Sequence, residues 1–183
     1  MTDASRSAPS RRLLLGGALA MTACKGRAQS APTLIAEPSA LKSLAPFPVG
    51  CCASLAELND PAYAALFLKN FSQLTPEWEM KMEYILKDDG TFRFDRPDAI
   101  AAWCKSNRIR LYATTLIWYA QKPGAFQRID GSGQGFADAY RNYILAVAGR
   151  YRGQAVGWDV VNEPVAEDGD GLRRLHAFRL HAA

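Results

Sequence analysis

Three features of the sequence predict an α/β fold, namely a partial TIM (β/α)8 barrel of about four units. Short runs of branched and aromatic residues alternate with segments whose apolar residues recur at helical spacing, which predicts parallel β/α units. The four runs lie between residues 47 and 162, a spacing that suits the repeat of such a barrel. Polar residues follow several runs, where barrel enzymes place their active sites. A doubly wound sheet is the alternative, but no G-x-G-x-x-G follows the first run.

Residues 1–32 predict an export leader of the twin-arginine type. Arg11 and Arg12 precede an apolar run at 13–23, which is too short to span a bilayer, and small residues follow this run. We therefore expect an exported protein, periplasmic or secreted, without a transmembrane span. A weaker lipoprotein pattern ends at Cys24. A disordered basic tail is the alternative interpretation of the same residues.

The net charge of the chain resides in this leader. Five basic residues and one acidic residue lie within 1–32 and the whole chain carries +4, so the remainder is neutral. The remainder also lacks a basic stripe with interleaved aromatic residues, and we expect no nucleic-acid partner. No cysteine pair has C-x-x-C spacing and only two histidines are present, so no metal site is predicted. The adjacent Cys51 and Cys52 are interpreted as small buried residues.

The elements of the expected barrel each have a local signal. A linker rich in proline, alanine and serine at 33–46 leads into a domain at 47–183 that has enough apolar residues for one core. Pro61 stands where a helix begins, before apolar residues at helical spacing. The predicted strands are 47–54, 72–75, 109–118 and 155–162, and the predicted helices are 61–71, 96–107 and 135–151.

The fourth predicted strand ends in an amide and a carboxylate, Asn162 and Glu163. Glycoside cleavage commonly uses two carboxyl groups, one of which donates a proton to the leaving oxygen. A donor must keep its proton near neutral pH, which requires partial burial or a nearby negative charge. The apolar residues around Glu163 favour partial burial, and Trp118 offers a flat apolar face to a sugar ring. On the triplet N-E-P alone, a loop-capping pair is the simpler interpretation.

Three longer motifs come in order at the ends of predicted strands. They are NFSQLTPEWEMKME at 70–83, TTLIWYAQKP at 114–123 and GWDVVNEP at 157–164. Together they resemble the endo-β-1,4-xylanases of glycoside hydrolase family 10, over about Leu44 to Arg174. The resemblance implies a (β/α)8 barrel that hydrolyses xylan, or a related β-1,4-linked polysaccharide, with retention of configuration and without a cofactor.

The resemblance also implies roles for individual residues. Glu163 matches the general acid/base, and Asn162 matches the asparagine that binds the 2-hydroxyl of the sugar at the cleavage point. Asp159 matches a position that supports the strand end. Four further residues match sugar contacts on the glycone side, namely Glu77, Lys81, Trp118 and Gln121. Glu79, two residues after Glu77, is likewise interpreted as a substrate contact rather than a nucleophile.

Three positions depart from the family pattern. Trp78 stands where the family usually has an asparagine, and Thr114 and Tyr119 stand where it usually has histidines. A threonine is shorter than a histidine and reaches less far toward a sugar hydroxyl. The resemblance therefore predicts glycone subsites that differ from those of a typical xylanase.

The family's nucleophile is a second glutamate on the seventh strand, whereas this sequence ends at Ala183, after the fourth. We therefore expect the chain to represent the N-terminal half of a secreted hydrolase, with the nucleophile outside it. The acidic residues at 167–170 are interpreted as a solvated loop. The alternative is an inactive fragment or a carbohydrate-binding remnant. A half barrel leaves strand edges open, so we expect marginal stability, aggregation or dependence on a partner.

Overall fold

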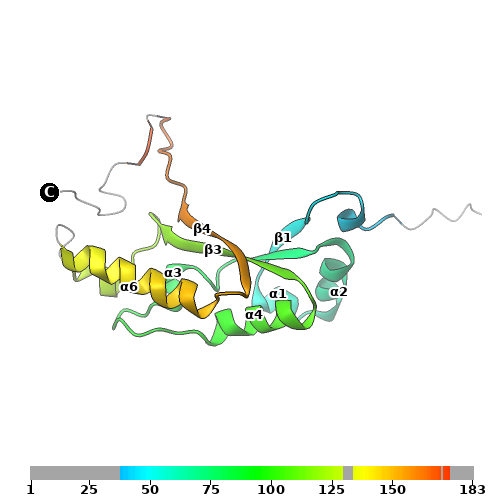
Figure 1. The fold of residues 1–183 in the computed structure, drawn as a ribbon, viewed down its shortest axis with the longest axis horizontal. Coiled ribbons are helices and arrows are strands. Elements are labelled where there is room, and N and C mark those ends of the chain that lie inside the picture. Colours follow the sequence, from blue (N-terminus) through cyan, green and yellow to red (C-terminus); the bar gives the residue numbers. More distant parts are fainter. Residues whose placement is uncertain (1–37, 130–133, 170, 174–183) are drawn as a thin grey trace, which may run out of the picture. The chain divides into compact units, whose positions relative to one another are not determined.

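The computed structural model describes residues 38–129, 134–169 and 171–173. The leader expected at 1–32, the lipoprotein pattern at Cys24 and the first part of the linker lie outside the described residues. A parallel four-stranded sheet organises the described part, and its strands follow one another in sequence order (Figure 1). The strands are β1 (Gly50–Ala53), β2 (Gln73–Pro76), β3 (Arg110–Trp118) and β4 (Ala155–Asn162).

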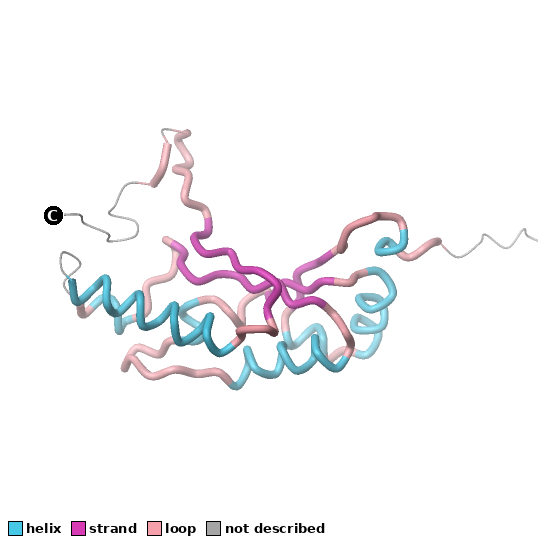
Figure 2. The backbone as a smooth tube through the Cα atoms, in the orientation of Figure 1, coloured by secondary structure: helices cyan, strands magenta, loops and turns pink. Residues whose placement is uncertain are grey.

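The α-helices lie on one face of this sheet, as Figure 2 shows. A doubly wound sheet carries helices on both faces, so the sequential strand order and the single helical layer exclude that alternative. The described residues form part of a (β/α)8 barrel, as the sequence predicts. The helices are α1 (Leu55–Leu58), α2 (Pro61–Asn70), α3 (Met82–Ile85), α4 (Asp95–Ser106), α5 (Gly124–Gln127) and α6 (Gln134–Arg150).

Side chains cap the first turns of α1 and α2. The Asp60 carboxylate accepts from the backbone N–H groups of Ala62 and Tyr63, and Pro61 occupies the first turn of α2. At α1, Ser54 and Glu57 form a capping box in which each side chain accepts from the other residue's backbone. These contacts satisfy N–H groups that have no partner within the helix. They explain why α1 forms although it is a single turn.

The predicted helices and strands are confirmed with small shifts at their ends. The structure adds the one-turn helices α1, α3 and α5, which are too short to show an apolar period in the sequence. Within the predicted linker, a 3-10 turn at Leu41–Ser43 contacts α2. There the Lys42 ammonium donates to the carbonyl of Leu68 at 2.6 Å.

The core lies between the sheet and its helices. Leu74 and Leu111 from the strands and Ile100 and Val147 from the helices are all buried. In contrast, β4 exposes three valines, with exposed fractions of 50% for Val156, 54% for Val160 and 43% for Val161. β4 is an end strand of the described sheet, so one side of these residues has no neighbouring strand to cover it.

The described cysteines are free thiols in different environments. Cys104 is buried, and burial raises the pKa of its thiol to about 12. Cys51 is half-buried. Cys52 is exposed, so the prediction of a buried residue is wrong for this position. The reason is that β1, like β4, is an end strand and one of its faces lacks cover.

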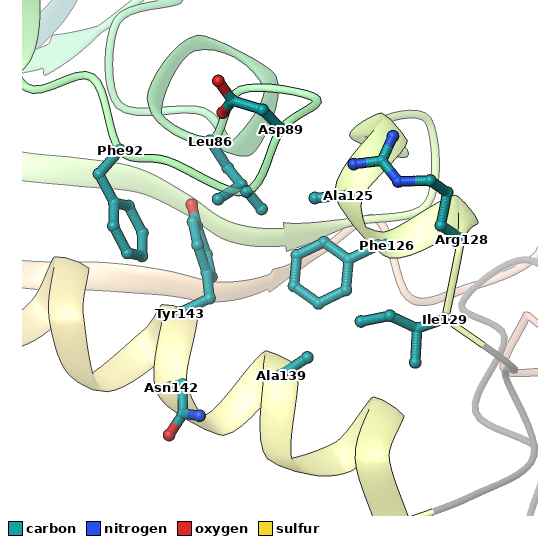
Figure 3. Close-up of a pocket in the computed structure, with 11 residues that line it drawn as sticks. Leu86, Asp89, Phe92, Ala125, Phe126, Arg128, Ile129, Ala139, Asn142 and Tyr143 are labelled. Atoms are coloured by element: carbon teal, nitrogen blue, oxygen red, sulfur yellow. The ribbon is translucent and has the colours of Figure 1, made fainter.

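A cavity of about 310 Å³ lies among α5, α6 and the loop after α3 (Figure 3). Its walls are mainly apolar and include Phe126 and Tyr143 (Figure 3). None of the residues predicted for substrate binding or catalysis lines this cavity. The Tyr143 hydroxyl is buried and has no hydrogen-bond partner in the described part of the chain. A buried hydroxyl without a partner lowers stability, because folding removes the water molecules that hydrogen-bond to it in the unfolded chain and supplies no other partner.

We expect the substitution Tyr143→Phe to raise the free energy of unfolding by about 1 kcal/mol, because it removes an unpartnered buried hydroxyl. The matched control is Tyr151→Phe. Tyr151 is as buried as Tyr143, but its hydroxyl donates to the Asp98 carboxylate at 3.0 Å, so the loss of this hydroxyl should lower stability by about 1–2 kcal/mol. Urea denaturation measures both values. Equal destabilisation by the two substitutions would contradict this account.

Candidate active site

The carboxyl ends of β2, β3 and β4 carry the predicted site residues. Trp118 ends β3 and Asn162 ends β4, and the two residues pair in the parallel ladder. Glu163 follows directly, with a φ of 51°. This left-handed conformation costs a non-glycine residue about 1–2 kcal/mol and turns the chain sharply out of the strand. The strand end therefore projects Glu163 beside the last residue of β3.

Trp118 and Glu163 are in direct contact. The indole Nε1–H of Trp118 donates to Glu163 Oε2 at 2.7 Å, which holds the carboxylate at a fixed place. Glu163 itself is exposed, so the expectation of partial burial is wrong for the described residues. The apolar neighbours Val160 and Val161 are themselves exposed on the end strand and give no cover.

The segment after β4 folds back and contacts the backbone of Glu163. Arg173 Nε donates to the carbonyl oxygen of Glu163 at 2.9 Å, and Arg173 also forms an ion pair with Glu167 at 3.2 Å. The guanidinium lies 3.5 Å from the ring centroid of Tyr119, whose hydroxyl donates to Glu167. Tyr119 therefore contacts this segment of the chain. The Glu167 side chain is 83% exposed, in line with a solvated loop.

Lys81 lies at the start of α3 and joins β2 to β3. Its ammonium lies 4.3 Å from the ring centroid of Trp78 and 5.0 Å from that of Trp118. Such cation–π contacts contribute about 0.5–1 kcal/mol each at exposed positions. The structure thus brings together Lys81, Trp118 and Glu163, three residues that the sequence predicts for one site.

Gln121 does not lie open to solvent. Its side chain is 6% exposed, and its Oε1 accepts from the backbone N–H of Glu83 at 3.3 Å. Glu83 in turn accepts from the backbone N–H of Lys122 at 2.7 Å. These reciprocal bonds join the loops that follow β2 and β3. The side-chain carbonyl of Gln121 therefore helps to hold this loop.

Glu77 and Glu79 differ in burial and in their partners, although both follow the end of β2. Glu77 is half-buried beside the Cys52 thiol, whose pKa is raised first by burial and then by the Glu77 charge. Glu79 is fully buried, accepts from the backbone N–H of Leu55 at 2.9 Å and pairs with Arg96 at 3.3 Å. The interpretation of Glu79 as a substrate contact is therefore wrong, because it ties α1 and α4 to the sheet.

Asp159 links β4 to β3. The Tyr112 hydroxyl donates to its carboxylate at 3.1 Å, and Thr115 Oγ1 donates to its carbonyl oxygen at 2.9 Å. Burial, followed by the hydrogen bond to Asp159, raises the pKa of Tyr112. Gly157 leaves room for this contact, since a Cβ there would lie 2.6 Å from the Tyr112 ring. Asp159 thus supports the strand end, as expected.

The groups at the strand ends are carboxylate, amide, ammonium and indole. In the described ranges, histidine, cysteine, aspartate and glutamate side chains do not gather in groups of three that suit a metal ion. The described helices also include none that is long and apolar enough to cross a membrane. The surface is suited to hydrogen bonding and stacking, which are the interactions that a sugar chain requires.

Comparisons with known proteins match most of the described chain. A family model described as glycosyl hydrolase family 10 matches residues 40–181. Endo-1,4-beta-xylanase A of Caldicellulosiruptor sp. (strain Rt8B.4) is 32% identical over 145 residues, covering 73% of this chain and 21% of that protein. Endo-1,4-beta-xylanase 2 of Claviceps purpurea is 31% identical over 127 residues, covering 69% of this chain and 39% of that protein.

Solved structures show the same relationship. Xylanase10C from Cellvibrio japonicus in complex with xylopentaose has a TM-score of 0.72 and 27% identity, covering 80% of this chain and 32% of that chain. A psychrophilic family 10 endo-beta-1,4-xylanase has a TM-score of 0.67 and 26% identity, covering 73% and 44%. The chain spans less than half the length of each of these four relatives.

We expect Glu79→Ala to lower the free energy of unfolding by about 2 kcal/mol, because it removes the buried acceptor of the Leu55 N–H, while Arg96, which also loses its partner, is 53% exposed and stays hydrated. Glu77→Ala is the matched control and should change stability by less than about 0.5 kcal/mol. Thermal or urea unfolding followed by circular dichroism gives both values. Similar losses for the two substitutions would show that Glu79 has no special structural role.

We expect Arg173→Gln to increase the rate of amide hydrogen exchange at 163–169, because it removes the contacts that hold this segment. Arg173→Lys should also increase the rate, since an ammonium lacks the planar fork that stacks and bonds at once. Arg152→Gln, at an exposed position after α6, is the control. Exchange rates that stay unchanged in the Arg173 variants would show that the contacts of Arg173 do not hold this segment.

Proposed function

Because the chain belongs to glycosyl hydrolase family 10, we propose that it carries the proton donor and the glycone-side surface of an endo-1,4-β-xylanase. The reaction is hydrolysis of internal β-1,4-xylosidic bonds in xylan by retaining double displacement. The relatives named above support this substrate class, since their names specify xylanase and one was solved with xylopentaose. We also propose that the protein is exported, from the leader at 1–32.

In the proposed mechanism Glu163 acts twice. It first protonates the oxygen of the leaving sugar while a nucleophilic glutamate, assigned by the family pattern to a seventh strand, attacks the anomeric carbon. It then takes a proton from water, which attacks the glycosyl–enzyme intermediate and releases the product. Asn162 binds the 2-hydroxyl of the sugar at the cleavage point, where it both donates and accepts.

The observation that carries this proposal is the contact between Trp118 and Glu163. The indole N–H engages Oε2 at 2.7 Å, whereas Oε1 has no hydrogen-bond partner among the described residues. Oε1 is therefore the oxygen available for proton transfer. A carboxylate that is already held in place does not lose conformational entropy before the reaction, whereas a freely rotating side chain does.

The second candidate function is carbohydrate binding without catalysis. The described sheet has four strands, whereas the family's nucleophile belongs to the seventh. Such a chain would bind xylooligosaccharides through Trp118 and Lys81 and leave them intact. Calorimetric titration together with product analysis separates the candidates, because only the hydrolase shortens the ligand.

We expect Glu163→Gln to reduce hydrolysis of xylan by about 10²–10⁴-fold, because glutamine cannot donate a proton to the leaving oxygen. The control is Glu167→Gln, which removes a neighbouring carboxylate and should retain most of the activity. Reducing-sugar release is measured for the 183-residue chain and for the product of a reading frame extended beyond codon 183. Equal activity after Glu163→Gln, or no activity in either form, would refute the hydrolase assignment.

A further inference from the structure

One ammonium group contacts two indole rings at the strand ends. Lys81 Nζ lies over the ring of Trp118, which donates to Glu163, and also over the ring of Trp78. Trp78 follows β2 and Glu163 follows β4, so these residues come from strands that are not neighbours in the sheet. Lys81 therefore joins Trp78 to the surface that carries the proposed proton donor.

Trp78 lies on the surface rather than in the core. Its side chain is 42% exposed, and Tyr84 of α3 lies beside it with 38% exposure. The two ring centroids are 6.1 Å apart and the ring planes are inclined by only 30°. Grouped exposed aromatic side chains are uncommon on soluble proteins, where they mark binding surfaces. Two partly exposed aromatic rings thus lie next to each other, and Lys81 lies over one of them.

The chemistry of position 78 differs from that of the asparagine that the family usually has there. An amide both donates to and accepts from a sugar hydroxyl, whereas an indole donates one hydrogen bond and accepts none. A tryptophan instead offers a large rigid area at low cost in conformational entropy. This exchange changes what the position recognises, from a hydroxyl group to the flat face of a ring.

We propose that Trp78 and Tyr84 form a stacking surface for a pyranose ring of the bound polysaccharide, and that Trp78 determines specificity there. The inference rests on the proposed function, because it places a β-1,4-linked sugar chain at Glu163. Lys81 has no hydrogen-bond acceptor among the described residues, so its N–H groups are available to an oxygen of the same chain. Stacking and donation then act on adjoining parts of one ligand.

The test is calorimetric titration of the 183-residue chain with xylohexaose. Trp78→Asn, which introduces the family's usual amide, should raise the dissociation constant by about tenfold, because the stacking area is lost. Trp78→Phe keeps a flat ring and should change it by less than about threefold. Phe47→Ala removes a 65% exposed aromatic residue before β1 and should leave binding unchanged.

The outcomes separate this inference from the function on which it rests. If neither the folded 183-residue chain nor the folded product of the extended reading frame binds xylohexaose, the xylan assignment fails and the inference fails with it. If the unaltered chain binds and Trp78→Asn binds equally well or more tightly, only the inference is overturned, since Trp78 then contributes nothing or narrows the site. Circular dichroism checks each fold. Should Trp78→Asn unfold, Trp78→Leu decides, because leucine keeps apolar bulk without a flat face.

Discussion

The parallel pairing of β3 with β4 is the constraint on which the site depends. It sets Trp118 beside Asn162, and the residue that follows then meets the indole N–H. The pairing contains two irregularities, one between Leu111 and Tyr112 and one between Thr114 and Ile117. They shift the register in opposite directions and cancel at the strand ends. A net slip of one residue would have turned Trp118 to the other face of the sheet.

The sequence was sufficient to predict the repeating elements, because each has a strong local signal. Branched residues at 109–118 and the proline at the start of α2 act over a few residues, and the structure agrees with them. The one-turn helices were missed, although the capping box formed by Ser54 and Glu57 was a readable signal for α1. The two register irregularities have no comparable local signal.

Site residues were harder to predict, because a side chain's role depends on what the fold places next to it. The sequence placed Trp118, Lys81 and Glu163 on one surface, since all three lie at or after the carboxyl ends of strands. It could not distinguish Glu79 from Glu77, because the distinction arises from Arg96 and the backbone of Leu55, which are distant along the chain. The burial of Gln121 likewise depends on Glu83 across two loops.

The outer edge of β4 has a consequence for any strand that pairs with it. Such a strand meets backbone N–H and C=O groups at fixed intervals, and hydrogen bonding allows it only certain alignments. A shift of one residue turns its side chains to the other face, so those on the side of Glu163 approach it in steps of two residues, or roughly 6.6 Å. The separation between Glu163 and a second reacting group therefore changes only in discrete steps, which the backbone register sets. Side-chain length can adjust it only within one step.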